Sequence, residues 1–527
     1  MTVEKVIKRL PLMVGFLIVG LAWAALSMWT GWYVIKPGFP DGFQSVGAAL
    51  GKHPGHLAWP FVGTFEGFDH TWGYHWFGWP LARSWFGTLL PWSCLGDASL
   101  LHLLRFGVAV HVGLLLHGKF RSSAGASIGF LTVLFHRGWF ASMAFLDRPE
   151  TWASVLLWFA AVPLLSSQSR KWHLWVAPIC LVLAPSVHPL TLAGAGLIVL
   201  AGTFRDGRTA LWKWWLPLLV GVAWFAFYYQ SDPARLQQLK DTLSAMRGLK
   251  SGIVQTFTRL FLDPRNVFFS APLLFITACS VLAWWKGGKA ARAETTPALT
   301  LTIALVLLAP LYLIATGHPN IGHGAVVAPF IGFAAGAAFH LVSGFPRAWR
   351  GLVRLGLGGQ AVACVLPLVL ATVAVATSKP TSPRDRARQV LAEALATSTG
   401  TVFIPLSLWE AAAERPPEEW ARIRFTTFPN LIPAERRLVY EKQSLSALSN
   451  GDILIVDGDA DSDPSGILPW PLVPVLQGKA GPWHRLTAFE PIVNTTAALG
   501  PWGKRETMLG SLTLLRYEPA GPATSIR

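Results

Sequence analysis

Long apolar runs recur between positions 1 and 376 and constrain the fold more than any other feature of the sequence. A straight helical crossing of a membrane needs about 20 mostly apolar residues. Several of the runs are shorter than this, and three prolines interrupt the stretch 174–204, which fits one span or two. Counted as two, the predicted spans lie at 11–35, 98–118, 124–145, 151–167, 174–186, 190–204, 212–230, 267–285, 297–316, 323–343 and 355–376.

The distribution of charge decides between one span and two over 174–204. Residues 377–527 carry 16 Lys or Arg and 16 Asp or Glu, so the whole net charge of +16 lies in residues 1–376. With two spans, the basic clusters of the short loops share one side of the membrane. With one span, the later clusters change sides, against the tendency of Lys and Arg to stay in the cytoplasm. We therefore expect eleven spans, with the N-terminus in the cytoplasm and the C-terminus outside.

The N-terminal residues fit two interpretations. Lys5, Lys8 and Arg9 precede the first apolar run, as in a cleaved signal peptide. The run continues to Ile35, which is longer than the apolar core of a usual signal peptide, so we expect a retained helix.

The four cysteines have no metal-ligand spacing, and the sequence has no P-loop or dinucleotide fingerprint. Nucleotide use is therefore not expected.

The predicted fold is an α-helical multi-pass membrane protein with a small α/β domain outside the membrane. Residues 1–376 form the membrane part, in which the outer segments 36–97 and 231–266 are long and each suggests a helix on the membrane surface. The part 377–527 opens with a Pro- and Ser-rich linker. A helical pattern and three strand-like runs follow it, at 385–397, 401–405, 452–456 and 512–517.

Asp41 lies six residues past the first predicted span, at the start of the first outer segment. A carboxylate there, beside many aromatic residues and outside the lipid, could act as a general base toward an acceptor hydroxyl. The same carboxylate could instead cap a surface helix, because Asp is among the best N-cap residues. The residues alone leave both interpretations open.

Other polar residues of this segment are Glu66, Asp69, His70, His75 and Arg83. The histidines lack the tight spacing of a zinc site. These side chains are therefore either pocket residues beside Asp41 or polar groups of an interfacial loop.

Polar residues also mark the outer ends of later spans. Arg148 opens the fourth span together with Glu150, where a guanidinium could grip a phosphate with two hydrogen bonds or the two residues could simply start a helix. Arg105 lies within an apolar span, as does Arg137; such charges usually face protein, water or a polar ligand. His188 and His323 fall at outer turns and are candidate pocket residues or structural histidines.

The layout resembles the GT-C superfamily of polyprenyl-phosphate-sugar-dependent glycosyltransferases, in particular the bacterial branch with the lipid A arabinosyl and protein mannosyl transferases. That branch has one span and then an outer loop that usually reads Asp-Glu, followed by a Gly and Pro region and a His-Pro-Pro-Leu-Tyr-like stretch. The counterparts here are Asp41-Gly42, Trp59-Pro60 and the stretch 74–81, Tyr-His-Trp-Phe-Gly-Trp-Pro-Leu. An Arg-Pro-Glu turn like 148–150 and a soluble domain after the last span also occur there. Gly42 departs from the second acid of the family pattern.

The resemblance implies an inverting transfer of a sugar from a polyprenyl-phosphate donor to an acceptor lipid, glycan or protein at the outer face of the membrane. Asp41 would be the general base and Arg148 a contact of the donor phosphate. It also implies a bacterial inner membrane, with the C-terminal domain in the periplasm. No cofactor is required by the sequence, although Glu66 and Asp69 could hold a divalent metal with Asp41. A transporter or flippase for lipid-linked glycans, or a non-catalytic assembly protein, is the alternative, and neither would depend on Asp41.

Overall fold

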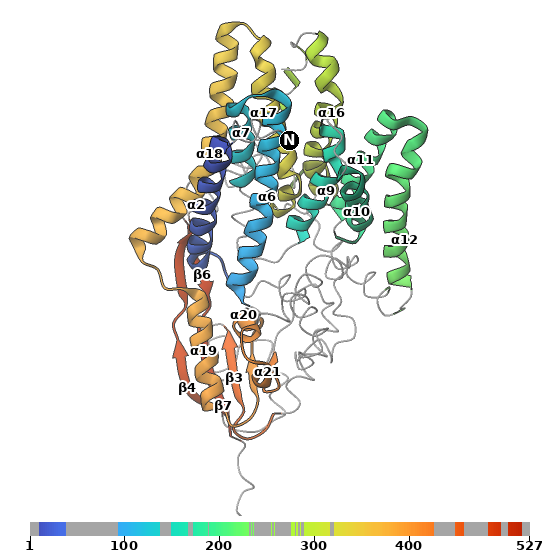
Figure 1. The fold of residues 1–527 in the computed structure, drawn as a ribbon. Coiled ribbons are helices and arrows are strands. Elements are labelled where there is room, and N and C mark those ends of the chain that lie inside the picture. The colour runs from blue at the N-terminus through green and yellow to red at the C-terminus, as the bar shows by residue number, and fades with distance from the viewer. Residues whose placement is uncertain are drawn as a thin grey trace, which may run out of the picture.

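The computed structural model consists of a helical bundle with a small α/β domain at one end (Figure 1). Short helical pieces between positions 233 and 285 are described in addition to the longer stretches. The longer described stretches are 10–37, 93–136, 149–166, 172–187, 189–230, 289–316, 321–425, 448–457, 483–496 and 504–518.

The bundle is built from apolar helices. In chain order they are α2 (Leu10–Val34), α6 (Cys94–Phe120), α7 (Ser123–Leu134), α9 (Pro149–Leu165), α10 (His173–Val187), α11 (Pro189–Asp206), α12 (Leu216–Gln230), α16 (Lys289–Thr316), α17 (Ala328–Leu341) and α18 (Arg347–Ser378). Short 3-10 helices occur at η1 (Gly207–Thr209), η3 (Ile321–Val327) and η4 (Val342–Gly344), and a π-helix at η2 (Leu211–Trp215).

The predicted fold class is confirmed. Every predicted span except 267–285, which lies mostly outside the described residues, overlaps one of these helices. The stretch 174–204 forms two helices, α10 and α11, which contact each other. Among the described residues, four helical stretches are long and apolar enough to cross a membrane on their own: Leu10–Val34, Cys94–Phe120, Gly324–Leu341 and Arg347–Ser378.

The outer surface of the bundle is apolar. Ile18 and Leu21 of α2 are 62% and 63% exposed, and Leu355 and Val362 of α18 are 74% and 68% exposed. Large exposed aliphatic side chains along two long helices would be costly in water, whereas lipid is as apolar as they are. These faces of α2 and α18 therefore fit contact with lipid.

Glycines let α7 and α17 approach each other closely. Gly125 and Gly129 lie one turn apart on α7, and Gly332 and Gly336 lie one turn apart on α17. A Cβ at Gly129 would lie 2.9 Å from the Gly332 carbonyl oxygen, and one at Gly332 would lie 2.6 Å from the Gly129 carbonyl oxygen. Small residues spaced by four let helix backbones touch within a membrane, where dispersion contacts drive helix association. This contact lies in the interior of the bundle.

The C-terminal domain is a mixed sheet covered by a helix. Its strands are β1 (Val402–Ile404), β2 (Ile423–Phe425), β3 (Ile453–Asp457), β4 (Trp483–Phe489), β5 (Ile492–Thr496), β6 (Lys504–Leu509) and β7 (Leu512–Tyr517). Five of them form a sheet in the order β2-β1-β3-β7-β4, parallel at β2-β1-β3 and antiparallel at β3-β7-β4, whereas β5 and β6 form a separate antiparallel pair. The helices are α19 (Pro383–Thr397), α20 (Trp409–Ala413) and α21 (Pro417–Trp420), with the 3-10 turn η5 (Leu406–Leu408).

The C-terminal domain has an apolar core of its own. Val390 and Leu391 of α19 pack with Ile453 and Ile455 of β3 in one buried apolar cluster. The predicted helix 385–397 and the predicted strands at 401–405, 452–456 and 512–517 correspond to α19, β1, β3 and β7. The short strand β2 and the strands β4 to β6 were not predicted.

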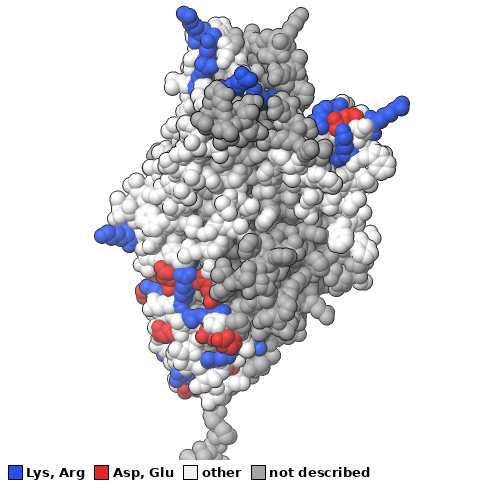
Figure 2. Space-filling view, viewed as in Figure 1, with Lys and Arg blue, Asp and Glu red and all other residues white. Residues whose placement is uncertain are grey.

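Basic residues gather at the end of the bundle opposite the C-terminal domain, as Figure 2 shows at the start of α18 and at the turn between α11 and α12. The residues that supply this charge are Arg205, Arg208, Lys213, Arg347, Arg350 and Arg354. The C-terminal domain carries charges of both signs (Figure 2). The middle of the bundle between these ends is largely without charge among the described residues on this face.

Candidate functional site

A buried arginine lies between the two bundle helices α6 and α9. Arg105 is fully buried, and its Nε and Nη2 donate to the Thr151 hydroxyl oxygen at 3.3 and 3.0 Å. The residue lies well inside α6, about three turns past the start of the helix at Cys94. Arg105 was predicted to face protein, water or a polar ligand; in the structure it faces the protein interior at the start of α9.

An acidic residue shares this site. Glu150 in the first turn of α9 is fully buried, and its carboxylate acts electrostatically on the Arg105 guanidinium. A carboxylate at a helix N-terminus also interacts favourably with the helix dipole. The structure thus brings together Arg105 and Glu150, two of the predicted site residues, and adds Thr151, which the sequence reasoning missed.

The interior beside Arg105 is polar along α6 and α2. His102 lies one turn before Arg105, its Nδ1 contacts the Ala98 carbonyl oxygen at 2.6 Å, and its ring packs on Trp23 with centroids 4.7 Å apart. His102 Nε2, Trp23 Nε1 and the hydroxyl of Ser27 are buried and make no hydrogen bond within the described part of the chain. Buried polar atoms are nearly always paired with protein or water. The interior next to Arg105 therefore contains further buried polar side chains, from α2 and α6.

The remaining predicted site residues are placed only in part. His323 lies in η3, whose backbone packs against α9 and α11. Its segment therefore contacts the helix that carries Glu150. The other predicted site residues lie outside the described residues: Asp41, His75, Arg83, Arg148 and His188, together with Glu66, Asp69 and Arg137.

The described residues contain no group of three or more His, Cys, Asp or Glu side chains that could hold a metal ion. The four cysteines are free, and all but Cys364 are buried. The described part of the site offers a buried guanidinium, a carboxylate and a hydroxyl group.

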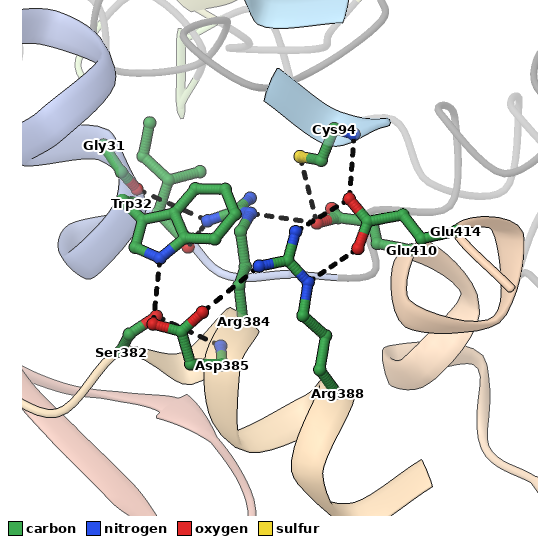
Figure 3. A network of polar contacts seen from close by, with 10 residues as sticks. Gly31, Trp32, Cys94, Ser382, Arg384, Asp385, Arg388, Glu410 and Glu414 are labelled. Carbon is green, nitrogen blue, oxygen red and sulfur yellow. Dashed lines mark hydrogen bonds and ion pairs between the residues drawn. The ribbon is translucent and has the colours of Figure 1, made fainter. Parts of the chain in front are cut away.

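A second buried cluster lies where the C-terminal domain meets the bundle (Figure 3). Arg384 Nε and Glu410 Oε2 form an ion pair at 2.9 Å, with the two side chains 2% and 6% exposed. The sequence alone did not single out Arg384. A signal was present, because Arg384 is three residues before Ala387 and seven before Leu391, which puts it on the apolar face of the predicted helix.

The comparisons with known proteins bear on the fold. No protein-family profile matches the sequence, and no curated protein matches it. Among solved structures, the crystal structure of ArnT from Cupriavidus metallidurans bound to undecaprenyl phosphate is similar, with a TM-score of 0.57 and 11% sequence identity over 95% of this chain and 97% of that chain. The apo structure of the same protein gives a TM-score of 0.48 at 12% identity, over 95% and 98% of the two chains.

The match to the bound structure extends over the bundle and the C-terminal domain together, because it covers nearly all of both chains. The predicted fold, a multi-pass helical bundle followed by a small α/β domain, is therefore confirmed. At the level of fold, this chain is a multi-pass membrane protein of the same architecture as ArnT.

Proposed function

We propose that this chain is a membrane glycosyltransferase that moves a sugar from a polyprenyl-phosphate-linked donor to an acceptor at the membrane face that carries the C-terminal domain. The observation that carries the proposal is the fold shared with a protein crystallised with undecaprenyl phosphate, the lipid that such a transfer releases. The buried Arg105 inside this fold supports it, since an arginine in a span usually faces protein, water or a polar ligand.

The proposed reaction is an inverting displacement. The acceptor hydroxyl oxygen attacks the anomeric carbon of the donor sugar while the bond from that carbon to the phosphate oxygen breaks and its electron pair stays on the phosphate. Asp41 takes the hydroxyl proton as general base. Because a phosphate is a good leaving group, the protein mainly has to position the two substrates and stabilise the departing charge.

Cationic groups would stabilise the departing phosphate. Arg148 directly precedes α9, so its guanidinium is proposed as the phosphate contact, by the resemblance to the family. Arg105 is proposed to hold the first turn of α9 in place through Thr151 and Glu150. Four further residues are proposed substrate contacts, namely His75, Arg83, His188 and His323. A metal held by acidic residues of the first outer segment is compatible with the proposal.

The orientation is proposed from the distribution of the charges. The basic end of the bundle, with Arg347 and Arg350 among its residues, is proposed to face the cytoplasm. The C-terminal domain would then lie outside, in the periplasm of a bacterial inner membrane. This orientation puts the junction between bundle and domain on the side where a lipid-linked sugar would be used.

The proposal is tested with the purified chain in nanodiscs, supplied with polyprenyl-phosphate sugars and an envelope extract as acceptor. We expect the native chain to release free polyprenyl phosphate and the Asp41→Asn variant to release none above background. The matched control is Asp206→Asn, which removes a carboxylate paired with Arg205 at the opposite end of the bundle and should leave the release unchanged.

Three outcomes separate the candidate functions. Release that depends on Asp41 but not on Asp206 supports the transferase with Asp41 as base. Equal release by Asp41→Asn and the native chain would refute Asp41 as the base. No release from the native chain with any donor, together with movement of the lipid-linked sugar across the membrane of vesicles that contain the chain, would favour a flippase.

A further inference from the structure

The C-terminal domain binds the end of the helix that leads into the first outer segment. Arg384 Nη1 donates to the carbonyl oxygens of Ile35 at 2.9 Å and Gly31 at 3.4 Å, at the C-terminal end of α2. From β5, Asn494 Nδ2 donates to the Tyr33 carbonyl oxygen at 2.6 Å. The last carbonyl groups of a helix have no partner within it. Here two residues of the C-terminal domain supply partners for the carbonyl groups of Tyr33 and Ile35, and Arg384 adds a second donor to that of Gly31, which also accepts from the Ile35 N–H.

The same domain binds the start of the helix that leaves this segment. The backbone N–H of Cys94, the first residue of α6, donates to Glu414 Oε1 at 3.0 Å. The Cys94 thiol lies 3.6 Å from Glu410 Oε2, and Cys94 is 3% exposed. Residues 38–92 are therefore flanked on both sides by helix ends that the C-terminal domain holds.

Two ion pairs link the contacts at the end of α2 with those at the start of α6 (Figure 3). Arg384, which binds the end of α2, is paired with Glu410, which lies against Cys94. One turn along α19, Arg388 donates to both carboxylate oxygens of Glu414 at 2.6 and 2.8 Å. Such two-bond contacts fix orientation as well as distance.

The signs of the charges match the helix ends that they meet. A cation is favourable at a helix C-terminus and an anion at a helix N-terminus, which is how Arg384 and Glu414 are distributed here. The hydrogen bonds with Glu414, opposed in part by burial, raise the pKa of Arg388 above its usual value. Arg388 therefore stays charged throughout the physiological pH range.

We propose that the C-terminal domain is a positioning element of the transfer reaction: through two ion pairs, Arg384 with Glu410 and Arg388 with Glu414, it fixes the end of α2 and the start of α6 relative to each other. The segment between these two helix ends carries Asp41, the proposed base. This inference rests on the proposed function for its catalytic consequence, whereas the attachment itself is a property of the junction. Arg384 and Glu410 are positioning residues and do not contact substrate.

The test measures the junction and the reaction separately, in the full chain in nanodiscs. In a background with Cys180, Cys279 and Cys364 replaced by Ala, the rate of maleimide labelling reports exposure of Cys94. The variants are Arg384→Ala, Glu410→Gln and Arg384→Lys. The matched control is Arg422→Ala, which removes an arginine whose hydrogen bonds go to carbonyl oxygens within the domain, those of Leu395, Ser398 and Gly400.

We expect Arg384→Ala and Glu410→Gln to label at least tenfold faster at Cys94 and to lower kcat about tenfold with little change in the donor KM. Arg384→Lys keeps the positive charge but loses the forked N–H donors of the guanidinium. Its labelling rate and its kcat should therefore lie between those of these two variants and those of the native chain. Arg422→Ala should stay within twofold of the native chain in both measurements.

Unchanged labelling in Arg384→Ala would overturn the attachment. Faster labelling with an unchanged kcat, or an equal loss of kcat in Arg422→Ala, would overturn the positioning role. A native chain without transferase activity would refute the proposed function and with it the catalytic consequence, while the labelling ratio would still decide whether the domain holds the two helix ends.

Discussion

The two buried arginines, Arg105 in the bundle and Arg384 at the domain junction, differ in the partners that the described residues give them. Arg384 is paired directly with a carboxylate at 2.9 Å and donates to carbonyl oxygens of another helix. Arg105 directs two N–H groups to one hydroxyl, that of Thr151, and the Glu150 carboxylate acts on it electrostatically. Arg384 therefore joins the C-terminal domain to the bundle, whereas Arg105 joins two helices within the bundle, α6 and α9.

The largest effect on stability is expected when Arg384 is removed. Arg384→Met leaves the Glu410 carboxylate buried without its ion-pair partner, and breaking a buried pair in this way costs about 3–5 kcal/mol. Unfolding followed by tryptophan fluorescence in mixed micelles measures the loss. The double variant Arg384→Met with Glu410→Leu removes both charges and should recover more than half of it.

The double variant also serves as the control for this comparison. If it is no more stable than Arg384→Met, the bonds from Arg384 to the carbonyl groups of α2 carry the stability and not the ion pair. That result would make the two buried arginines more alike, since each would then act mainly through neutral oxygen atoms.

The lengths of the apolar runs and the positions of the basic residues predicted the helices of the bundle, because both can be read from short stretches of the sequence. A run such as 11–35 is apolar enough to be a span whatever its neighbours, and α2 occupies nearly the same residues. The division of 174–204 into α10 and α11 came from the sidedness of the basic clusters. The packing of Gly129 on Gly332 was not predictable in this way, because the pairing of two apolar helices leaves no trace in either one alone.

The sequence singled out those residues whose chemical character differs from that of their neighbours. Arg105 stands out as a charge in an apolar run, so it was found, whereas Thr151 is ordinary in a helix and was missed. Arg384 and Glu410 were missed because their meaning depends on contacts with Ile35 and Cys94, which lie far from them in the sequence. The strands β5 and β6 are short and partly polar, so neither gave a clear signal.

Removal of Arg105 should affect activity about as much as stability, which sharpens the contrast with Arg384. Arg105→Met loses its hydrogen bonds to Thr151, and a bond to a charged group is worth about 1.5–3 kcal/mol. We expect a similar loss in unfolding free energy, and a fall in kcat/KM for transfer of about 100-fold, which corresponds to about 2.7 kcal/mol in the barrier.

The split between the kinetic constants distinguishes the two arginines. For Arg105→Met the donor KM should rise, because the start of α9, next to the proposed phosphate contact Arg148, is no longer held. For Arg384→Ala the effect should fall on kcat. A raised donor KM in both variants, at equal folded fractions, would contradict the assignment of different roles.

The smallest effect is expected at the exposed edge of the junction, for Asp385→Asn. The Asp385 side chain and that of its partner Arg388 are both exposed, and such surface pairs contribute about 0–1 kcal/mol. The amide oxygen of Asn could still accept the hydrogen bond that Trp32 Nε1 donates at 3.2 Å. We therefore expect a change in unfolding free energy below about 1 kcal/mol and no faster labelling of Cys94. A loss of unfolding free energy as large as that of Arg384→Met would mean that the charged residues of the junction act as one network. The effect of Arg384→Met would then come from the whole cluster and not from the loss of the buried pair with Glu410.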